Sequence, residues 1–394
     1  MCVNSDFLIK EADRCVKCGL CLPHCPTYQL ARDEAESPRG RIALIQGWAA
    51  GDLQADQSML AHLDHCLLCR RCEGACPSGV NYTALMDAAR ASLPSTTPRW
   101  LPDVLADSGR QRMAMKLAVV AGKSGMQAWF PSAIVRRLLR IAATLTAFES
   151  GSSAPLKEHY AATNTLQGEV AVFTGCMGAT VDRPAIDAAI EIITASGYAV
   201  SIPPSQQCCG AMHAHAGYRQ RAAQQKRINQ VLFAGKGYDS LITLSSGCGS
   251  YLADMAELDC TVMDAGAFIQ QIGGIGTLPL TEIRRKIAIF LPCTLAAMGQ
   301  QKQVMALLQD LPGAELIELQ AMGCCGGAGL HLVTRPHTGE QLVKPLIHQL
   351  AASQATIVAT TNSGCALQLQ MAANKAGLGI SVVHPLELVA QQLQ

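Results

Sequence analysis

The chain has 394 residues, of which 49% are hydrophobic and 15% charged, and its formal net charge is +1. This length predicts two or three domains, and the balanced charge argues against a nucleic-acid partner, which would favour a basic stripe. No apolar run of about 18 residues or more occurs, so we predict no transmembrane helix.

The N-terminal stretch MCVNSDFLIKEADRC has acidic residues and no long apolar core, so it is not expected to be a secretory signal. We therefore expect a cytoplasmic protein, in which disulfides are rare. The 18 cysteines then need another use, and metal binding is the use that we predict.

Two cysteine runs near the N-terminus share the spacing C-x2-C-x2-C-x3-C-P, which is typical of bacterial ferredoxins. A tight loop with two-residue gaps presents three soft thiolates to one cluster, and the fourth cysteine, followed by proline, turns away and ligates the other cluster. We therefore predict two [4Fe–4S] clusters. The first is assigned to Cys15, Cys18, Cys21 and Cys76, and the second to Cys66, Cys69, Cys72 and Cys25.

Structural zinc is the alternative for these runs, but zinc sites usually use two separated pairs of ligands, whereas both runs here are complete. His24 and His65 lie beside the cysteines and are expected to face solvent or to support the ligands. Between the runs, GRIALIQGWAA has helical spacing. We predict an α-helical ferredoxin domain over residues 1–94.

A basic segment follows, and we interpret residues 95–165 as a helical connector and linker. The stretch PSAIVRRLLRIAATLTAF predicts an amphipathic helix capped by Ser132, with Arg136, Arg137 and Arg140 on its polar side. We favour a helix that packs on the protein, and peripheral contact with the inner membrane is the alternative. ESGSSAPLKEHYAATNTLQ is expected to be a linker.

The rest of the chain repeats itself at a spacing of about 116 residues. VAVFTGCMGATV resembles IAIFLPCTLAAM, QQCCGAMHAHAG resembles MGCCGGAGLHLV, and LITLSSGCGSYL resembles IVATTNSGCALQ. Each copy alternates strands and helices, which predicts an α/β unit with a mainly parallel sheet. We place the two units at residues 166–280 and 281–394.

The cysteines of each unit follow its predicted strands, where open α/β sheets place their sites. Gly210 and Gly326 permit a sharp turn after each cysteine pair. A further metal site is therefore a prediction, and buried inert cysteines are the alternative. The first cysteine group comprises Cys176, Cys208, Cys209 and Cys248, and the second comprises Cys293, Cys324, Cys325 and Cys365.

Two ferredoxin runs, the stretch SPRGRI between them and two units with CCG resemble the iron–sulfur subunit of bacterial glycolate oxidase over nearly the whole chain. CCG units also resemble parts of heterodisulfide reductase, of lactate-utilisation proteins and of anaerobic glycerol-3-phosphate dehydrogenase. Heterodisulfide-type units end in C-x-x-C, but here Tyr251 and Gln368 replace the last cysteine, which puts disulfide reduction in doubt.

The resemblance implies an electron-transfer subunit of a glycolate (2-hydroxy acid) dehydrogenase complex. FAD is expected only in a partner subunit, since GGAGLH follows a cysteine pair and is not a dinucleotide fingerprint. Electrons would pass from that flavin through the clusters to a quinone or another carrier. Three roles stay open for the CCG half: binding a further cluster, shaping the quinone site, or serving mainly as a docking surface. His213 and His215 are expected to lie at a helix start or on the surface; proton transfer is the alternative.

Two other functions remain open at this point. One is a component that resembles the CCG-containing subunit of anaerobic glycerol-3-phosphate dehydrogenase. The other is a non-catalytic assembly module for flavoprotein subunits. No catalytic residue is assigned to this chain.

Overall fold

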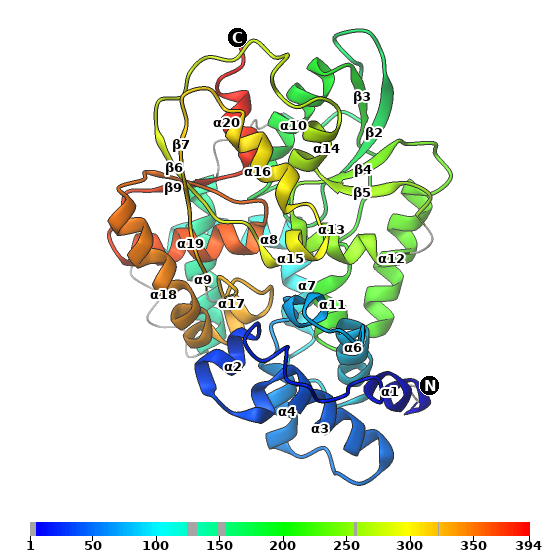
Figure 1. Ribbon diagram of the computed structural model, residues 1–394. Coiled ribbons are helices and arrows are strands. Elements are labelled where there is room, and N and C mark those ends of the chain that lie inside the picture. Colours follow the sequence, from blue (N-terminus) through cyan, green and yellow to red (C-terminus); the bar gives the residue numbers. More distant parts are fainter. Residues whose placement is uncertain (1–4, 124–131, 149–153, 256–257, 322) are drawn as a thin grey trace.

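The computed structural model describes residues 5–123, 132–148, 154–255, 258–321 and 323–394, and Figure 1 shows their arrangement. The N-terminal helices lie at one end of the molecule. The two repeated α/β units lie side by side at the other end. Within the described ranges, no helix is long and apolar enough to cross a membrane.

The described N-terminal residues form helices and no strand. Ser37 caps α3 by accepting a hydrogen bond from the Gly40 amide, and Pro38 occupies its first turn, which fixes where this helix begins. The predicted helix between the two runs is therefore confirmed. The elements are α1 (Ser5–Ala12), α2 (Pro26–Ala31), η1 (Glu34–Glu36), α3 (Pro38–Ala50), α4 (Gln57–Asp64), α5 (Arg71–Gly74) and α6 (Tyr82–Ser92).

The connector contains α7 (Trp100–Leu105), α8 (Ser108–Lys123), α9 (Ala133–Leu145) and η3 (Thr146–Phe148). The amphipathic helix predicted here is α9, and Ser132 caps it as expected. Its apolar side packs against α17 and α19 of the second unit, so that side is covered by protein. Arg137 was expected on the polar side, but its Nε donates to the Leu332 carbonyl at 2.9 Å.

The first unit contains a five-stranded sheet in the order β1-β3-β2-β4-β5. All its strands are parallel except β1, which comes from the segment predicted as a linker and pairs antiparallel with β3. That part of the linker prediction is wrong, and residues 149–153 lie outside the described residues. The elements are β1 (His159–Tyr160), β2 (Gly168–Phe173), α10 (Arg183–Ala195), β3 (Tyr198–Ser201), α11 (Ala211–His215), α12 (Arg219–Phe233), β4 (Ser240–Thr243), α13 (Ser246–Ala253), β5 (Thr261–Asp264) and α14 (Ala265–Gln271).

The second unit contains a parallel sheet in the order β7-β6-β8-β9. This order is equivalent to β3-β2-β4-β5 of the first unit, so the duplication seen in the sequence is also a duplication of topology. The elements are β6 (Lys286–Ile289), α15 (Cys293–Ala297), α16 (Gln301–Gln309), β7 (Glu315–Glu318), α17 (His331–Thr334), α18 (Pro336–Ser353), β8 (Ile357–Ala359), α19 (Ser363–Lys375), β9 (Ser381–Val383) and α20 (Pro385–Ala390).

The central strand of each sheet is buried on both faces, as parallel strands usually are. In β2, Val170 and Val172 point into a core that the two units share, whereas Ala171 and Phe173 point towards the first cysteine group. Strand β6 divides its side chains in the same way. Alternation along one strand therefore builds the shared core and one wall of the cysteine site together.

Helices α10, α14, α16 and α20 lie between the two sheets (Figure 1). The C-terminal helix α20 packs on α10, which belongs to the other unit. A backbone bridge between Leu280 and Leu393 joins the segment between the units to the end of the chain. The two repeats therefore share one hydrophobic core.

Candidate metal and redox centre

The two ferredoxin runs fold into similar loops. Lys17 and Gly19 in the first run have positive φ angles of 56° and 86°, and the equivalent Leu68 and Arg70 have 51° and 62°. Left-handed residues at the same two positions turn the backbone back on itself between successive cysteines. The repeated spacing thus produces a repeated loop.

The structure brings the eight cysteines together in two sets. One small cavity, of about 30 Å³, has the four cysteines of the first predicted cluster in its wall. A second, of about 20 Å³, has the four cysteines of the second predicted cluster. The fourth cysteine of each run thus lies in the cavity wall with cysteines of the other run, and Cys72 lines both cavities. Each set offers four thiols, which is the donor set of a [4Fe–4S] cluster.

A buried ion pair lies behind the second set. Arg41, with its side chain 1% exposed, donates to Glu36 Oε2 at 2.6 Å and to Thr27 Oγ1 at 3.1 Å. The Thr27 hydroxyl lies 3.3 Å from the Cys25 sulfur. Burial opposes the charge of Arg41, but Tyr82 and the thiols nearby, together with Glu36, raise its pKa. Arg41 therefore remains a cation beside the cysteines.

His62 and His65 complete this network, since the Nδ1 atoms of both lie 2.7 Å from Glu36 Oε1. Burial opposes the charge of Glu36, but hydrogen bonds from His65 and His62, and the charge of Arg41, lower its pKa. His65 therefore supports the ligand region, one of the two roles expected for it, and His24 is exposed. Glu36, His62 and His65 each offer one potential metal-ligand atom, and these atoms lie within 4.8 Å of one another. Arg41 already neutralises the Glu36 carboxylate.

The first cysteine group lies at the ends of three strands of the first sheet. Hydrogen bonds link Cys176 with Cys208, Cys208 with Cys209, and Cys209 with Cys248. Gly210, at φ 103°, ends the loop that carries the cysteine pair. The bonds from Cys176 and Cys209 hold the pKa of the Cys208 thiol well below its usual range, so a thiolate forms most readily there.

The second cysteine group has the equivalent place in the second sheet. The sulfurs of Cys325 and Cys365 are 2.9 Å apart, and Cys293 hydrogen bonds with Cys324. The amides of Gly326 and Gly327 donate to the sulfurs of Cys324 and Cys325, both at 3.3 Å. The glycines of GGAGLH therefore shape the thiol site, as predicted. Backbone amides that face sulfur are suited to a thiolate-bound cluster.

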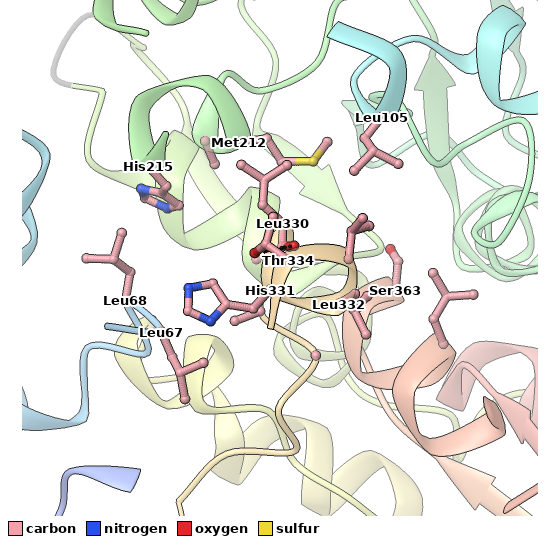
Figure 2. A pocket seen from close by; sticks show the side chains of 18 of the residues that line it. Leu67, Leu68, Leu105, Met212, His215, Leu330, His331, Leu332, Thr334 and Ser363 are labelled. Atoms are coloured by element: carbon pink, nitrogen blue, oxygen red, sulfur yellow. Dashed lines mark hydrogen bonds between the residues drawn. The ribbon is translucent and has the colours of Figure 1, made fainter. Parts of the chain in front are cut away.

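One cavity of about 480 Å³ connects the three parts of the molecule. All eight cysteines of the two cysteine groups lie in its wall, together with Cys66 and Cys69 of the second run. Cys69 also hydrogen bonds with Cys293, so the ferredoxin part touches the second cysteine group directly. Figure 2 shows leucines of the second run and of α17 around the His331 ring in this cavity.

Some residues of the site depart from expectation or were not predicted. His213 lies in the first turn of α11, one of the two places expected for it, but it is 1% exposed and lies 3.1 Å from Asp103. His215 lies at the cavity wall, 2.9 Å from Asp87. The sequence pattern did not single out Arg41 or His331, since a lone basic residue has no characteristic spacing.

Comparison with known proteins agrees with these observations. Residues 11–80 match the family described as 4Fe-4S dicluster domain, and residues 170–253 and 287–370 match the family described as cysteine-rich domain. The chain is 29% identical to the probable glycolate oxidase iron-sulfur subunit of Bacillus subtilis (strain 168), over 97% of this chain and 94% of that protein. It is 27% identical to the glycolate oxidase iron-sulfur subunit of Escherichia coli (strain K12), over 96% and 94%.

A more partial match is a subunit of anaerobic glycerol-3-phosphate dehydrogenase from Escherichia coli (strain K12), which is 27% identical over 57% of this chain and 59% of that protein. The two nearly full-length matches, together with the two domain-family matches, confirm the predicted resemblance to glycolate oxidase iron–sulfur subunits.

Proposed function

We propose that this chain, which belongs to the 4Fe-4S dicluster and cysteine-rich domain families and resembles glycolate oxidase iron–sulfur subunits along nearly its whole length, is the electron-transfer subunit of a 2-hydroxy acid dehydrogenase complex. The observation that carries this proposal is the unbroken series of thiol sets. The two ferredoxin sets share the wall residue Cys72, and Cys69 touches Cys293 of the second cysteine group.

We assign one [4Fe–4S] cluster to Cys15, Cys18, Cys21 and Cys76, and the other to Cys66, Cys69, Cys72 and Cys25. Each cysteine group of the α/β units offers four more thiols for a further iron–sulfur group. Iron–sulfur clusters supply single-electron transfer when they are bound. The protein contributes the spacing of the thiols, their burial, and amide and guanidinium donors beside them.

The assignment of domains follows the same division. We propose a helical ferredoxin domain at 1–94, a connector at 95–165, and cysteine-rich α/β units at 166–280 and 281–394. The described cysteines are all free thiols, which suits the reducing cytoplasm that we propose as the location.

Oxidation of the hydroxy acid and binding of FAD are assigned to a partner subunit. The chain then receives electrons at the ferredoxin part and delivers them to a quinone or another carrier. The match to anaerobic glycerol-3-phosphate dehydrogenase suggests a second substrate class, glycerol phosphate. The hydroxy-acid assignment has more support, because the glycolate oxidase subunits match over nearly the full length of both chains.

The test is anaerobic purification of the chain with its partners, followed by counting of iron and flavin. About eight irons per chain are expected from the two ferredoxin sets alone, and about four more for each cysteine group that holds a cubane. Flavin should remain with the partner when the subunits are separated. Zinc in place of iron after anaerobic reconstitution would overturn the proposal, as would stable flavin in the isolated chain.

A further inference from the structure

The central cavity is far larger than the two cavities of the ferredoxin part. Its volume is about 480 Å³, against about 30 and 20 Å³. Sites for small organic molecules usually have about 300 to 1,000 Å³, are mostly apolar and contain a few polar groups. The central cavity has all three properties.

We propose that this cavity binds the quinone that accepts the electrons, with the quinone ring against His331 and the apolar part of the molecule against the leucines of α7, α9 and α17. The proposal rests on the proposed function of the chain. It adds the place of the acceptor, its chemical class and the residues that contact it.

Thiols from three parts of the chain line the cavity. They come from the second ferredoxin run, through Cys66 and Cys69, and from both cysteine groups. A molecule in the cavity thus lies next to every thiol set except the ferredoxin set of Cys15, Cys18, Cys21 and Cys76. A compound that receives electrons at the end of the series is expected at such a place.

The remaining wall selects a neutral and largely apolar molecule. Leu105, Ile141, Leu145, Leu330 and Leu332 form much of it. These residues come from the connector, from Leu330 and from α17, so the apolar wall exists only where the connector packs on the second unit. Such a wall binds a hydrocarbon skeleton through burial of apolar surface.

The terminal nitrogens of Arg90 donate to the carbonyls of Leu63, Cys66 and His215 at 2.5 to 3.0 Å, and its buried Nε has no partner among the described residues. Arg335 lies 3.9 Å from the Asp64 carboxylate. A phosphate or carboxylate ligand needs free cationic donors, and the terminal nitrogens of Arg90 are not free, so this arginine does not favour an anionic ligand.

His331 is the polar group best placed for the ring. Its Nδ1 atom is buried and has no hydrogen-bond partner among the described residues. Burial, with Arg90 and Arg335 nearby, lowers the pKa of His331 to about 3, so the ring is neutral. The quinone therefore meets the neutral ring of His331 as part of the cavity wall, and not through this buried nitrogen.

Reduction of the quinone needs two electrons and two protons. The electrons come one at a time from the reduced iron–sulfur groups, the protons come from water, and the two carbonyls of the quinone become hydroxyls. Protons have a route past His215, whose side chain is 30% exposed and hydrogen bonds with Asp87. His215 lines the same cavity.

The experiment uses the full-length chain with its iron–sulfur groups, reduced anaerobically and mixed with a decyl-substituted benzoquinone in a stopped-flow instrument. Reoxidation of the clusters, followed by visible absorbance, should saturate with quinone concentration. Leu105→Trp places a larger ring in the cavity, and Leu166→Trp places the same ring on the surface, where Leu166 is 66% exposed.

We expect Leu105→Trp to raise the half-saturating quinone concentration by about tenfold or more, and Leu166→Trp to leave it unchanged. His331→Leu changes the wall against which the quinone ring packs and should raise it by about threefold. Iron content and reoxidation by ferricyanide, a hydrophilic oxidant that does not need the cavity, should be normal in all three variants. Met212→Phe, on the same cavity wall, replaces Leu105→Trp if the latter loses iron.

Reoxidation that is linear in quinone concentration, or equally fast in Leu105→Trp and the unmodified chain, would overturn the proposal. An equal effect of Leu166→Trp would overturn it too. Reduction of the clusters by the partner's flavin, measured before quinone is added, tests the proposed function separately. That step can succeed even if the quinone site lies elsewhere.

Discussion

The thiol of Cys69 hydrogen bonds with the thiol of Cys293, which joins the second ferredoxin run to the second cysteine group. The two residues are distant in the sequence and lie in segments that match different domain families. Among the described residues, Cys69 thus joins the ferredoxin part to the α/β units by a direct side-chain contact.

The first prediction concerns this junction. In the assembled complex, Cys69→Ser should leave flavin reduction by the hydroxy acid rapid, because that chemistry precedes the iron–sulfur groups. Reoxidation by quinone should be slower by about tenfold or more. Stopped-flow absorbance resolves the two phases. Cys260→Ser is the matched control, since Cys260 belongs to neither ferredoxin set and to neither cysteine group. Normal reoxidation in assembled Cys69→Ser would remove the second cluster from the route.

The second prediction concerns the exchange of fourth ligands between the runs. Cys76 lies with Cys15, Cys18 and Cys21 in the wall of one cavity. Cys76→Ser and Cys15→Ser should therefore disturb the same EPR signal, and Cys66→Ser should disturb the other one. If Cys76→Ser altered only the signal that Cys66→Ser alters, each run would hold its own cluster and the assignment would be wrong.

The third prediction concerns the buried pair of Arg41 and Glu36. Removal of one partner leaves a buried charge without compensation, which typically costs about 3 to 5 kcal/mol. Arg41→Met should therefore lower the free energy of unfolding by about 3 kcal/mol, measured by anaerobic urea denaturation. The double variant Arg41→Met/Glu36→Gln should lose less than the sum of the single variants. Strict additivity would mean that the pair is not coupled.

The fourth prediction concerns the turn after the second cysteine pair. Gly326 has φ 81°, and a Cβ atom there would lie 2.5 Å from the Gly339 Cα. Gly377 has φ 69° with nothing within 4 Å of such an atom, so Gly377→Ala tests the backbone conformation alone. That variant should lose about 1 to 2 kcal/mol of stability. Gly326→Ala should lose clearly more, together with iron. Equal losses would show that the close approach to Gly339 is unimportant.

The fifth prediction concerns pH. Burial raises the pKa of Asp182 to about 7, although Ser363 donates to both carboxylate oxygens at 2.7 and 2.9 Å. The folded chain therefore binds a proton that the unfolded chain releases near pH 4, and stability falls as pH rises from about 4 to 7. Above pH 7 this contribution is constant.

Asp182→Asn removes that contribution and should flatten the profile, measured as the free energy of unfolding at pH 5 and pH 8. Asp264 and Glu387, whose pKa burial also raises to about 7, add to the fall, whereas His331 and His384, whose pKa burial lowers to about 3, oppose it. The test is therefore the difference between the variant and the unmodified chain. Asp52→Asn, at an exposed position, is the control and should keep the full slope. An unchanged slope in Asp182→Asn would contradict the assignment.

Local patterns predicted much of this molecule. The spacing of apolar residues and the Ser132 cap located α9, and the repeated motifs located both sheets, because these signals act within a few residues. The linker prediction failed at His159 and Tyr160, since a two-residue edge strand forms only when β3 lies beside it. Composition alone carries no information about such a neighbour.

The sequence predicted which residues could be ligands, but not how the sets of ligands lie relative to one another. Cysteine spacing indicated which residues could bind metal, because loop geometry fixes that spacing. The contact of Cys69 with Cys293, the ion pair behind Cys25 and the cavity with His331 all depend on how separate domains pack. Long-range packing of this kind leaves no periodic trace in one sequence.

The packing of α20 on α10 has a consequence for biosynthesis. During translation, α10 leaves the ribosome long before α20, so the part of α10 that α20 covers stays exposed until the last residues emerge. Partly made chains with exposed apolar surface aggregate readily and are substrates for chaperones. The two cysteine-rich units are therefore expected to complete their folding together, after synthesis of the chain has ended. If a gene were split between the two units, each fragment would need the other to cover its apolar surface.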